Sequence, residues 1–357
     1  MLSLLEAIRP TTLIRSAKLI DHLGLDITIA CETFQQTGSF KFRAAYNLAL
    51  NVPNDRLLTA SSGNFGQGLA YSAKLLGKQC TVVMPATSAQ VKIDAVRGYG
   101  AAVDLIDTKT VGRTERIEQL CDEMPDAYIA SPYDDQFVID GNATLGHELS
   151  GGNFDAIVVP IGGGGLISGT IQALKSEPRA VATGLLSMRN AECGVRNVDP
   201  SEPQATATLS NAETQRRGES EPQRLSDSAL KVDSSGPAIF GAEPLLGNDA
   251  ARSFRSGHLT ANETEPTTIA DGARTLSLGK LNWPIIRDGA EDIIEVSDAK
   301  ITEAVRLYFA LANLKCEPTA ALSLGAILEN KERFRGQKVC LIVSGGNVDP
   351  DVYRKLI

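Results

Sequence analysis

The segment DAIVVPIGGGGLISGTIQALK, residues 155–175, decides the fold class of this chain. It begins with a short apolar run that predicts a buried strand. Four consecutive glycines follow at 162–165, and the remainder has the pattern of a helix. A strand, a glycine turn and a helix in this order are typical of α/β proteins with parallel sheets covered on both faces.

The same order recurs elsewhere in the chain. Residues 57–61 predict a strand that leads into the glycine-rich run SGNFGQG and then into a helix at 69–77. Residues 79–86 predict another buried strand, and 91–100 a helix closed by glycine. Near the end, KVCLIVSGGN again places glycines after a strand. Because ligands of such folds bind at the carboxyl ends of strands, we expect the functional site at these glycine turns.

Composition and charge exclude several classes of protein. The chain has 357 residues, 43% of them hydrophobic, with a formal charge of −8. The absence of a basic stripe argues against a nucleic-acid partner. No apolar run approaches the roughly 20 residues of a membrane helix. The six cysteines are scattered without a zinc or CxxC spacing, which favours reduced thiols in a cytoplasmic protein.

One segment, residues 197–236, departs from the pattern. It contains no Phe, Tyr, Trp or Ile and is dense in polar residues and proline. Such a segment cannot bury enough apolar surface to offset its ordering entropy, so we predict a disordered loop. A solvated insertion without a chemical role is favoured over a regulatory one, and an error in the gene model is a third interpretation.

Lys41 lies between two phenylalanines at a predicted helix start, in TGSFKFRAAYN. Ser39 or Thr37 is expected to cap that helix. The positive end of the helix, together with Phe40 and Phe42, would lower the pKa of the amine and make it a nucleophile toward an aldehyde. Taken alone, Lys41 favours the commoner case of a surface lysine whose stem lies on apolar neighbours.

Three glycine motifs could hold small ligands. The run at 162–165 lets backbone N–H groups converge on an anion such as a phosphate, and it matches neither a Walker A loop nor GxGxxG. SSGNFGQG could hold a second anion, such as a carboxylate; within it Asn64 offers an amide and Ser62 a hydroxyl that could move a proton. Ser344, at the end of the last buried strand, could bond a ring nitrogen.

The order SFK, SSGN, tetraglycine and SGGN resembles the fold-type II pyridoxal-phosphate enzymes, specifically the serine/threonine dehydratase and serine racemase family. GAEPLLGNDA and TTIADGARTLSLGKLNWPIIRD also match that group, so the resemblance covers nearly the whole chain apart from the polar segment. It implies a two-domain α/β fold like that of tryptophan synthase β, with open, mostly parallel sheets flanked by helices. The expected small domain spans 51–134, the large cofactor-binding domain spans 1–50 and 135–357, and a homodimer is expected.

The resemblance implies a role for each motif in holding pyridoxal 5′-phosphate. Lys41 would bind the cofactor covalently and act as base at the substrate Cα, and Phe40 would lie near the cofactor ring. Asn64 would bond the ring's 3′ oxygen, and Ser344 would face the pyridine nitrogen. The phosphate would be held by Gly162, Gly163, Gly164, Gly165 and the N–H of Leu166.

The implied activity is an ammonia-lyase reaction that converts L-serine, L-threonine or a related 3-hydroxy amino acid to a 2-oxo acid and ammonia. The substrate carboxylate would be held by Ser61, Ser62, Gly63 and Asn64. The main alternative is a serine or amino-acid racemase, in which Ser62 donates a proton on the face opposite Lys41. An inactive metabolite-binding homologue is a more remote alternative, and a cysteine-synthase-like replacement enzyme fits SGGN and TIADGA less well.

The run GAEPLLGND resembles the divalent-cation site of the racemase group. Glu243 and Asp249 would supply carboxylates and Gly247 a carbonyl, a set of oxygen ligands that suits Mg²⁺ or Ca²⁺. An acidic surface loop is the alternative.

Three departures from the family pattern bear on the substrate. One is the polar segment, which enters just before the predicted strand AIFGAEP; the other two lie close to the expected site. Phe65 stands where histidine is usual, and DGNATLGHE replaces the usual GQGT run. Arg274 is a candidate contact for an anionic side chain, such as that of a 3-hydroxyaspartate.

Overall fold

The computed structural model describes residues 2–61, 63–88, 90–175 and 236–357. These belong to the first of two units of the chain, which comprises residues 1–182 and 236–357. The segment predicted to be disordered lies, apart from Gly236, outside the described residues.

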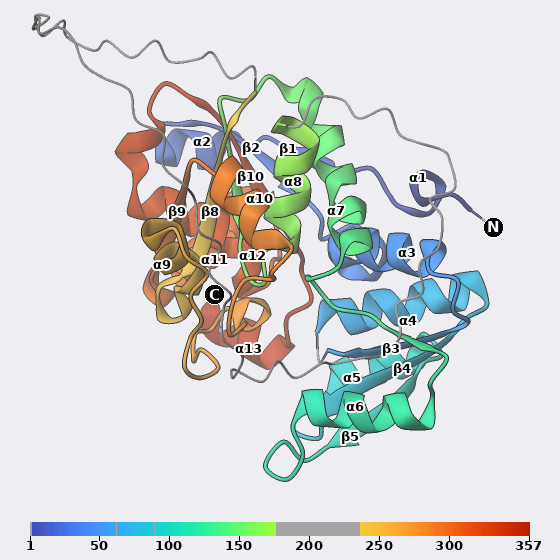
Figure 1. Cartoon of the computed structure of the whole chain (residues 1–357). Coiled ribbons are helices and arrows are strands. Elements are labelled where there is room, and N and C mark those ends of the chain that lie inside the picture. The colour runs from blue at the N-terminus through green and yellow to red at the C-terminus, as the bar shows by residue number, and fades with distance from the viewer. Residues whose placement is uncertain (1, 62, 89, 176–235) are drawn as a thin grey trace, which may run out of the picture. The chain divides into compact units, whose positions relative to one another are not determined.

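The described strands form two sheets (Figure 1). β1 pairs with β2 antiparallel, and every other neighbouring pair is parallel, which confirms the expected α/β class. The six-stranded sheet has the order β1 (Thr12–Ile14), β2 (Asp26–Cys31), β10 (Lys338–Val343), β7 (Ala156–Pro160), β8 (Ala238–Pro244) and β9 (Asp292–Val296). The four-stranded sheet has the order β5 (Ala102–Ile106), β4 (Gln79–Pro85), β3 (Arg56–Ala60) and β6 (Ala127–Ile129).

Helices alternate with these strands along the chain, as the repeated sequence pattern predicts. The helix expected at 69–77 begins earlier, at Asn64, because Gly63 takes the N-cap position. The helices are α1 (Leu4–Ala7), α2 (Ala17–Leu23), α3 (Lys41–Asn51), α4 (Asn64–Leu76), α5 (Gln90–Gly98), α6 (Arg113–Glu123), α7 (Gln136–Leu149), α8 (Gly165–Lys175), α9 (Asp249–Ser256), α10 (Asn282–Gly289), α11 (Asp298–Ala312), α12 (Pro318–Glu329) and α13 (Pro350–Leu356). Within the described ranges, no helix combines the length and the apolar character needed to cross a bilayer.

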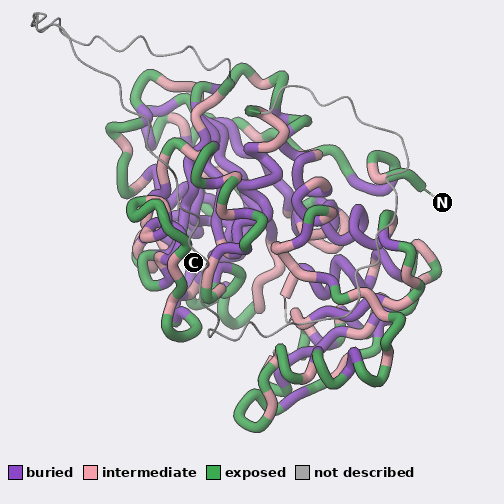
Figure 2. The backbone as a smooth tube through the Cα atoms, viewed as in Figure 1, coloured by how far each residue is buried: buried purple, intermediate pink, exposed green. Residues whose placement is uncertain are grey.

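The central strands of the six-stranded sheet are buried on both faces (Figure 2), whereas the edge strand β1 is largely exposed. In β10, Val339, Leu341 and Val343 belong to the hydrophobic cluster on one face, and Cys340 and Ile342 to the cluster on the other. Side chains alternate between faces along a strand, so a strand covered on both sides is apolar at every position. This is why the sequence shows continuous apolar runs.

All strands of the four-stranded sheet lie between residues 56 and 129. The boundaries of the small domain at 51 and 134 stay a prediction.

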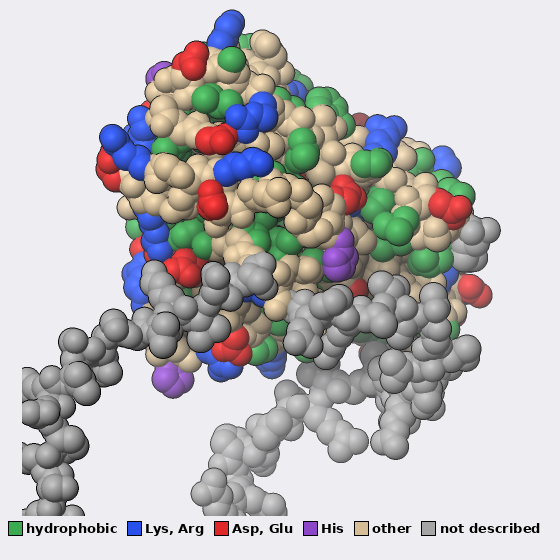
Figure 3. Space-filling model, turned by 90° about the horizontal axis from the view of Figure 1, so that it is seen from above, with side chains coloured by type: hydrophobic (Ala, Val, Ile, Leu, Met, Phe, Trp, Pro, Cys, Tyr) green, Lys and Arg blue, Asp and Glu red, His purple; other side chains and the backbone are tan. Residues whose placement is uncertain are grey.

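On the face drawn in Figure 3, basic and acidic side chains are interspersed.

A buried ion cluster centred on Arg43 fixes helix α3. The guanidinium is fully buried, with Nε 2.7 Å from Glu32 Oε2 and Nη1 2.7 Å from Glu148 Oε1. Glu32 follows β2, and Glu148 lies in α7. The cluster therefore ties α3, which begins at Lys41, to the six-stranded sheet and to α7.

Replacing Arg43 by alanine is expected to lower the free energy of unfolding by about 3–5 kcal/mol, because it leaves the buried Glu32 carboxylate without its partner. Urea unfolding measures this loss. Arg15→Ala is the control, since the Arg15–Asp26 pair is half exposed and is expected to contribute about 0–1 kcal/mol. Similar losses in the two variants would contradict a structural role for the buried cluster.

Candidate active site

Lys41 is the first residue of α3, and its amine lies among aromatic rings. Its Nζ donates a hydrogen bond to the backbone oxygen of Pro132 at 2.7 Å. The ring centroids of Phe40 and Phe65 lie 5.0 and 5.9 Å from Nζ. Burial lowers the pKa of the Lys41 amine to about 8, against an opposing effect of the Glu317 carboxylate. The amine is therefore much closer to neutrality at physiological pH than an exposed lysine.

The local causes differ in part from the prediction. The N-cap residue of α3 is Phe40, which makes no side-chain cap bond, so the expected capping by Ser39 or Thr37 is wrong. Both hydroxyl oxygens are instead buried without a hydrogen-bond partner. Phe42 faces away from the amine, into a cluster around α1. The second ring near Nζ belongs to Phe65, which α4 brings in from another part of the chain.

Asn64 joins two further motifs at the same place. Its Nδ2 donates to the two Glu317 carboxylate oxygens at 2.8 and 3.0 Å, and its Oδ1 accepts from Asn347 Nδ2 at 2.8 Å. Asn347 also donates to the backbone oxygen of Thr37 at 2.7 Å. Thus SSGN, SGGN and the segment before Lys41 are held together by side-chain amides.

Glu317 is a site residue that the sequence reasoning missed. It is 5% exposed, and burial, followed by the charge of Asp271, raises the pKa of its carboxyl to about 7. It directly precedes the strongly apolar helix α12. Because an acid directly before a helix is commonly a residue that interacts with the helix N-terminus, the sequence offered no distinct indication of a role in the site.

Ser344 is 2% exposed at the end of β10, and its backbone oxygen accepts from the Phe40 N–H at 2.9 Å. The next residue, Gly345, bridges to Ser39. A Cβ on Gly345 would lie 2.8 Å from both Glu317 Oε1 and Ser39 Cβ. Glycine is therefore required for the strand end to approach the Lys41 segment.

The tetraglycine run connects β7 to α8. Gly164 has φ +92°, and a Cβ on Gly163 would lie 2.2 Å from Cγ of Tyr133. Gly162 is equally confined, since its Cβ would lie 2.8 Å from the Gly272 oxygen. Tyr133 follows Pro132, the acceptor of the Lys41 bond, so the glycines and the lysine are linked through one short segment.

The amino end of α8 has the free donors that an anion needs. The first helical hydrogen bond is given by the Ser168 N–H to the Gly164 oxygen at 3.0 Å. The N–H groups of Gly165 and Leu166 come before it and have no partner within the helix. An anion at this end would also gain from the helix dipole.

SSGN begins α4 with Gly63 as its N-cap residue. The Ser61 hydroxyl accepts from the N–H groups of Gly63 and Gly66 at 3.4 and 3.2 Å. Ser62, the candidate for the second proton transfer, lies outside the described residues.

The predicted metal residues lie after β8. Glu243 accepts two backbone N–H bonds from the first turn of α9, at 2.9 and 2.8 Å. Asp249 Oδ1 accepts from Asn262, whereas its Oδ2 is buried without a partner. Burial and the charge of Asp249 raise the pKa of Glu243. Gly247 ends the short helix η3 (Leu245–Gly247).

The carboxylate oxygens at this loop are of the kind that binds a cation, but they are few. The described residues contain no group of three or more His, Cys, Asp or Glu side chains that could hold a metal ion. A cation here would need the Gly247 carbonyl or water in addition to the two carboxylates. The partnerless Asp249 oxygen is the atom that a cation would satisfy.

Arg274, the candidate contact for an anionic side chain, is exposed. Its Nε donates to the backbone oxygen of Thr268 at 2.8 Å, so the start of its guanidinium is tied to its own loop. The contact with a substrate stays a hypothesis.

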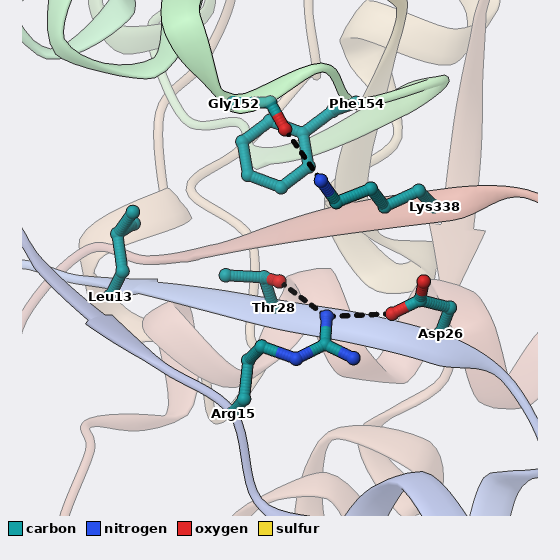
Figure 4. A pocket seen from close by; sticks show the side chains of 7 residues that line it. All are labelled: Leu13, Arg15, Asp26, Thr28, Gly152, Phe154 and Lys338. Atoms are coloured by element: carbon teal, nitrogen blue, oxygen red, sulfur yellow. Dashed lines mark hydrogen bonds and ion pairs between the residues drawn. The ribbon is translucent and has the colours of Figure 1, made fainter.

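A cavity of about 620 Å³ lies at the opposite end of β10 (Figure 4). Lys338, which lines it, is the first residue of β10, whereas Ser344 follows the last. Lys338 and Ser344 are six residues apart, which at about 3.3 Å per residue corresponds to roughly 20 Å. The cavity is lined by Leu13, Arg15, Asp26, Thr28, Gly152, Phe154 and Lys338, and none of these belongs to the predicted site.

Comparison with known proteins identifies the family. Residues 4–231 and 228–345 match the family described as pyridoxal-phosphate dependent enzyme. This chain is a member of that family. The half-buried Lys41 amine, with its lowered pKa, suits an aldehyde, and the glycines at the start of α8 suit a phosphate, so the residues present fit the cofactor. The family resemblance and the fold-type II class predicted from the motifs are confirmed.

Several relatives span almost the whole chain. It is 34% identical over 360 residues to an L-threo-3-hydroxyaspartate ammonia-lyase of a Pseudomonas species, covering 99% of this chain and 95% of the relative. It is 32% identical over 350 residues to a serine racemase of Schizosaccharomyces pombe, covering 96% and 90%. The crystal structure of a threonine deaminase from T.th. has a TM-score of 0.75 and 33% identity, covering 96% of this chain and 94% of that one.

We expect pyridoxal phosphate to add to Lys41 of the cofactor-free protein at a rate that rises as pH increases through about 8, because only the uncharged amine attacks an aldehyde. An ordinary lysine would require a pH near 10. Absorbance measures the rate, and borohydride reduction with peptide mapping identifies the residue.

Glu317→Gln provides the internal check of this pH dependence. The Glu317 charge raises the pKa of Lys41, so its removal should move the midpoint to lower pH. A midpoint near 10, or one that Glu317→Gln leaves unchanged, would contradict the described surroundings of the amine.

Proposed function

We propose that this protein is a pyridoxal-phosphate dependent ammonia-lyase that converts L-serine, L-threonine or a related 3-hydroxy amino acid to a 2-oxo acid and ammonia. The observation that carries the proposal is the half-buried Lys41 amine, whose pKa desolvation lowers to about 8. It lies where SFK, SSGN and SGGN are joined by hydrogen bonds. The ammonia-lyases among the relatives support the same reaction type.

Each motif has a task in this proposal. Lys41 would hold the cofactor, with Phe40 beside it, and the Asn64 amide, which donates to Glu317 in this structure, would donate one N–H to the oxygen of the cofactor ring. Ser344 bonds its ring nitrogen. Gly162 to Gly165 and the Leu166 N–H receive the phosphate at the amino end of α8. The segment Ser61 to Asn64 receives the substrate carboxylate.

The proton transfers follow from the state of Lys41. Bound pyridoxal phosphate withdraws electrons from the substrate Cα and so permits loss of its proton. Lys41 accepts that proton, and its pKa of about 8 suits a base that works near neutral pH. The electron pair left at Cα forms a C=C bond as the Cβ–O bond breaks. The hydroxyl leaves as water by taking up a proton equivalent to the one that Lys41 removed from Cα, so the elimination is neutral in protons. The enamine that is released tautomerises and reacts with water to give the 2-oxo acid and ammonia.

Among 3-hydroxy amino acids, we favour 3-hydroxyaspartate. Three of the relatives are named as ammonia-lyases or dehydratases of hydroxyaspartate. Phe65 stands where histidine is usual in the family, and its ring is buried near the Lys41 amine. This side of the site therefore lacks a polar side chain, so other residues must bind the polar groups of the substrate.

Racemisation is the second candidate function, because SSGN retains a serine at position 62 and several relatives are serine racemases. Ser62 would return a proton to Cα on the face opposite Lys41.

Cytoplasmic location and a homodimer stay predictions.

The decisive experiment incubates the purified holoenzyme with a panel of 3-hydroxy amino acids and assays 2-oxo acid, ammonia and product chirality. We expect 2-oxo acid and ammonia in equal amounts, and loss of at least about 10³-fold in rate in Lys41→Ala, since base and cofactor anchor are both removed. Lys78→Ala is the matched control, because Lys78 also has a pKa lowered by burial and also donates to a backbone oxygen.

Three outcomes would contradict the proposal. Activity retained by Lys41→Ala would exclude the assigned base. A D-amino acid as the main product would favour the racemase. Cofactor bound at Lys41 without turnover of any member of the panel would indicate a metabolite-binding protein.

We further propose that Glu243, Asp249 and the Gly247 carbonyl bind Mg²⁺ or Ca²⁺. A cation would relieve the repulsion between the two buried carboxylates and occupy the partnerless Asp249 oxygen. The ion should therefore raise the melting temperature of metal-depleted protein in a concentration-dependent way. Asp249→Asn should abolish the rise, and Asp140→Asn, in α7, should not. An equal rise in both variants would count against the site.

A further inference from the structure

Two ion pairs join the helices that flank the four-stranded sheet to segments that follow β8 in the chain. Lys92 of α5 lies with its Nζ 2.6 Å from Asp271 Oδ2, and Arg113 of α6 lies 3.2 Å from Glu265. The Lys92 side chain is 22% exposed and that of Asp271 43%. Partly exposed pairs usually contribute little to stability, so the position of the Lys92 pair is of more interest than its strength.

Asp271 begins the short helix η4 (Asp271–Ala273), which packs against the tetraglycine run. We call this run, Gly162 to Gly165, the glycine cradle, and η4 forms one of its walls. The Gly272 backbone oxygen lies only 2.8 Å from the position that a Cβ would take on Gly162. The Gly272 N–H donates to Thr319 Oγ1 at 2.9 Å. η4 therefore packs between the first glycine of the cradle and the first turn of α12, the helix that follows Glu317.

The pair also lies within electrostatic reach of the buried acid. The charge of Asp271 raises the pKa of the Glu317 carboxyl, whereas Lys92 and Lys41 lower it, as does the hydrogen bond from Asn64. Lys92 and Asp271 thus act on Glu317 with opposite signs.

We propose that Lys92 is a positioning residue for the reaction: it holds Asp271, and through Asp271 it holds η4 against Gly162 and the start of α12. The proposal rests on the proposed ammonia-lyase function and extends it to a pair of residues to which no role is assigned above. Without Lys92, η4 loses its tie to α5, and both the cradle wall and the surroundings of Glu317 lose a constraint.

The test compares holoenzymes of four variants with the wild type: Lys92→Met, Asp271→Asn, the double variant, and the exchanged pair Lys92→Asp/Asp271→Lys. Lys300→Met is the matched control, since the Lys300–Glu303 pair is also partly exposed but lies on α11. The readouts are the dissociation constant of pyridoxal phosphate, from absorbance titration, and kcat/KM for the best substrate of the panel.

We expect each single variant to lose about 10-fold in cofactor affinity and in kcat/KM, and the double variant to lose no more than either single variant, because the two residues act as a unit. The exchanged pair should recover most of the cofactor affinity. Lys300→Met should match the wild type.

The pH profile separates positioning at the site from general support of the fold. Protonation of Glu317 weakens its charge-assisted hydrogen bond with Asn64. Activity is therefore expected to fall as the pH decreases through the pKa of Glu317, about 7, which gives the pH profile an acidic limb. Removal of the Asp271 charge should move this acidic limb to lower pH, and removal of the Lys92 charge should move it to higher pH. A purely structural role would not produce shifts of opposite sign.

Additive losses in the double variant, unchanged cofactor affinity in Lys92→Met, or shifts of the same sign would each overturn the proposal. Failure of the proposed function is distinguishable from these results, because the wild type would then release no 2-oxo acid from any substrate. The cofactor titration would still test the role of the pair in that case.

Discussion

The site depends on keeping one amine largely out of water. The Lys41 ammonium loses hydration between the rings of Phe40 and Phe65, and desolvation disfavours the charged form. Only part of that loss is returned by Glu317, which itself is held near neutrality by burial. A fully ionised acid beside the lysine would stabilise the ammonium form, whereas removal of the acid would favour the neutral amine still more. Burial is thus the main cause of both pKa shifts, the Glu317 charge opposes it at Lys41, and the chemistry of an aldehyde-binding lysine follows from the lowered pKa of the amine.

This arrangement requires several loops to approach more closely than side chains allow. Gly345 lies against Glu317 and Ser39, Gly163 lies under the Tyr133 ring, and Gly162 lies against the backbone of η4. At each of these positions a Cβ would lie within 3 Å of another atom. The glycines thus serve two purposes: they expose backbone N–H groups to an anion, and they let the ends of separate strands meet around Lys41.

The helix that carries Lys41 is held in place by buried ion pairs and not by close contacts of glycines. Helix α3 is anchored by Arg43, whose buried guanidinium reaches Glu32 and Glu148 from two other elements. Breaking a buried pair leaves an uncompensated charge, so such a cluster specifies one arrangement of its elements strongly. It places the first turn of α3, and with it Lys41, at the carboxyl ends of β2 and β10, where ligands bind in open parallel sheets.

The sequence by itself determined the alternation of strands, glycine turns and helices, and the motifs with Lys41, Asn64, Gly162 to Gly165 and Ser344. These are local properties, because apolar period and glycine content are read within one element. The tertiary structure decided which side chains surround the amine. Phe65 replaces Phe42 as its second aromatic neighbour, Phe40 replaces Ser39 or Thr37 as the N-cap, and Glu317 enters from a distant, C-terminal part of the chain. Such neighbours are set by sheet order and helix packing, which bring together segments that no sequence pattern links.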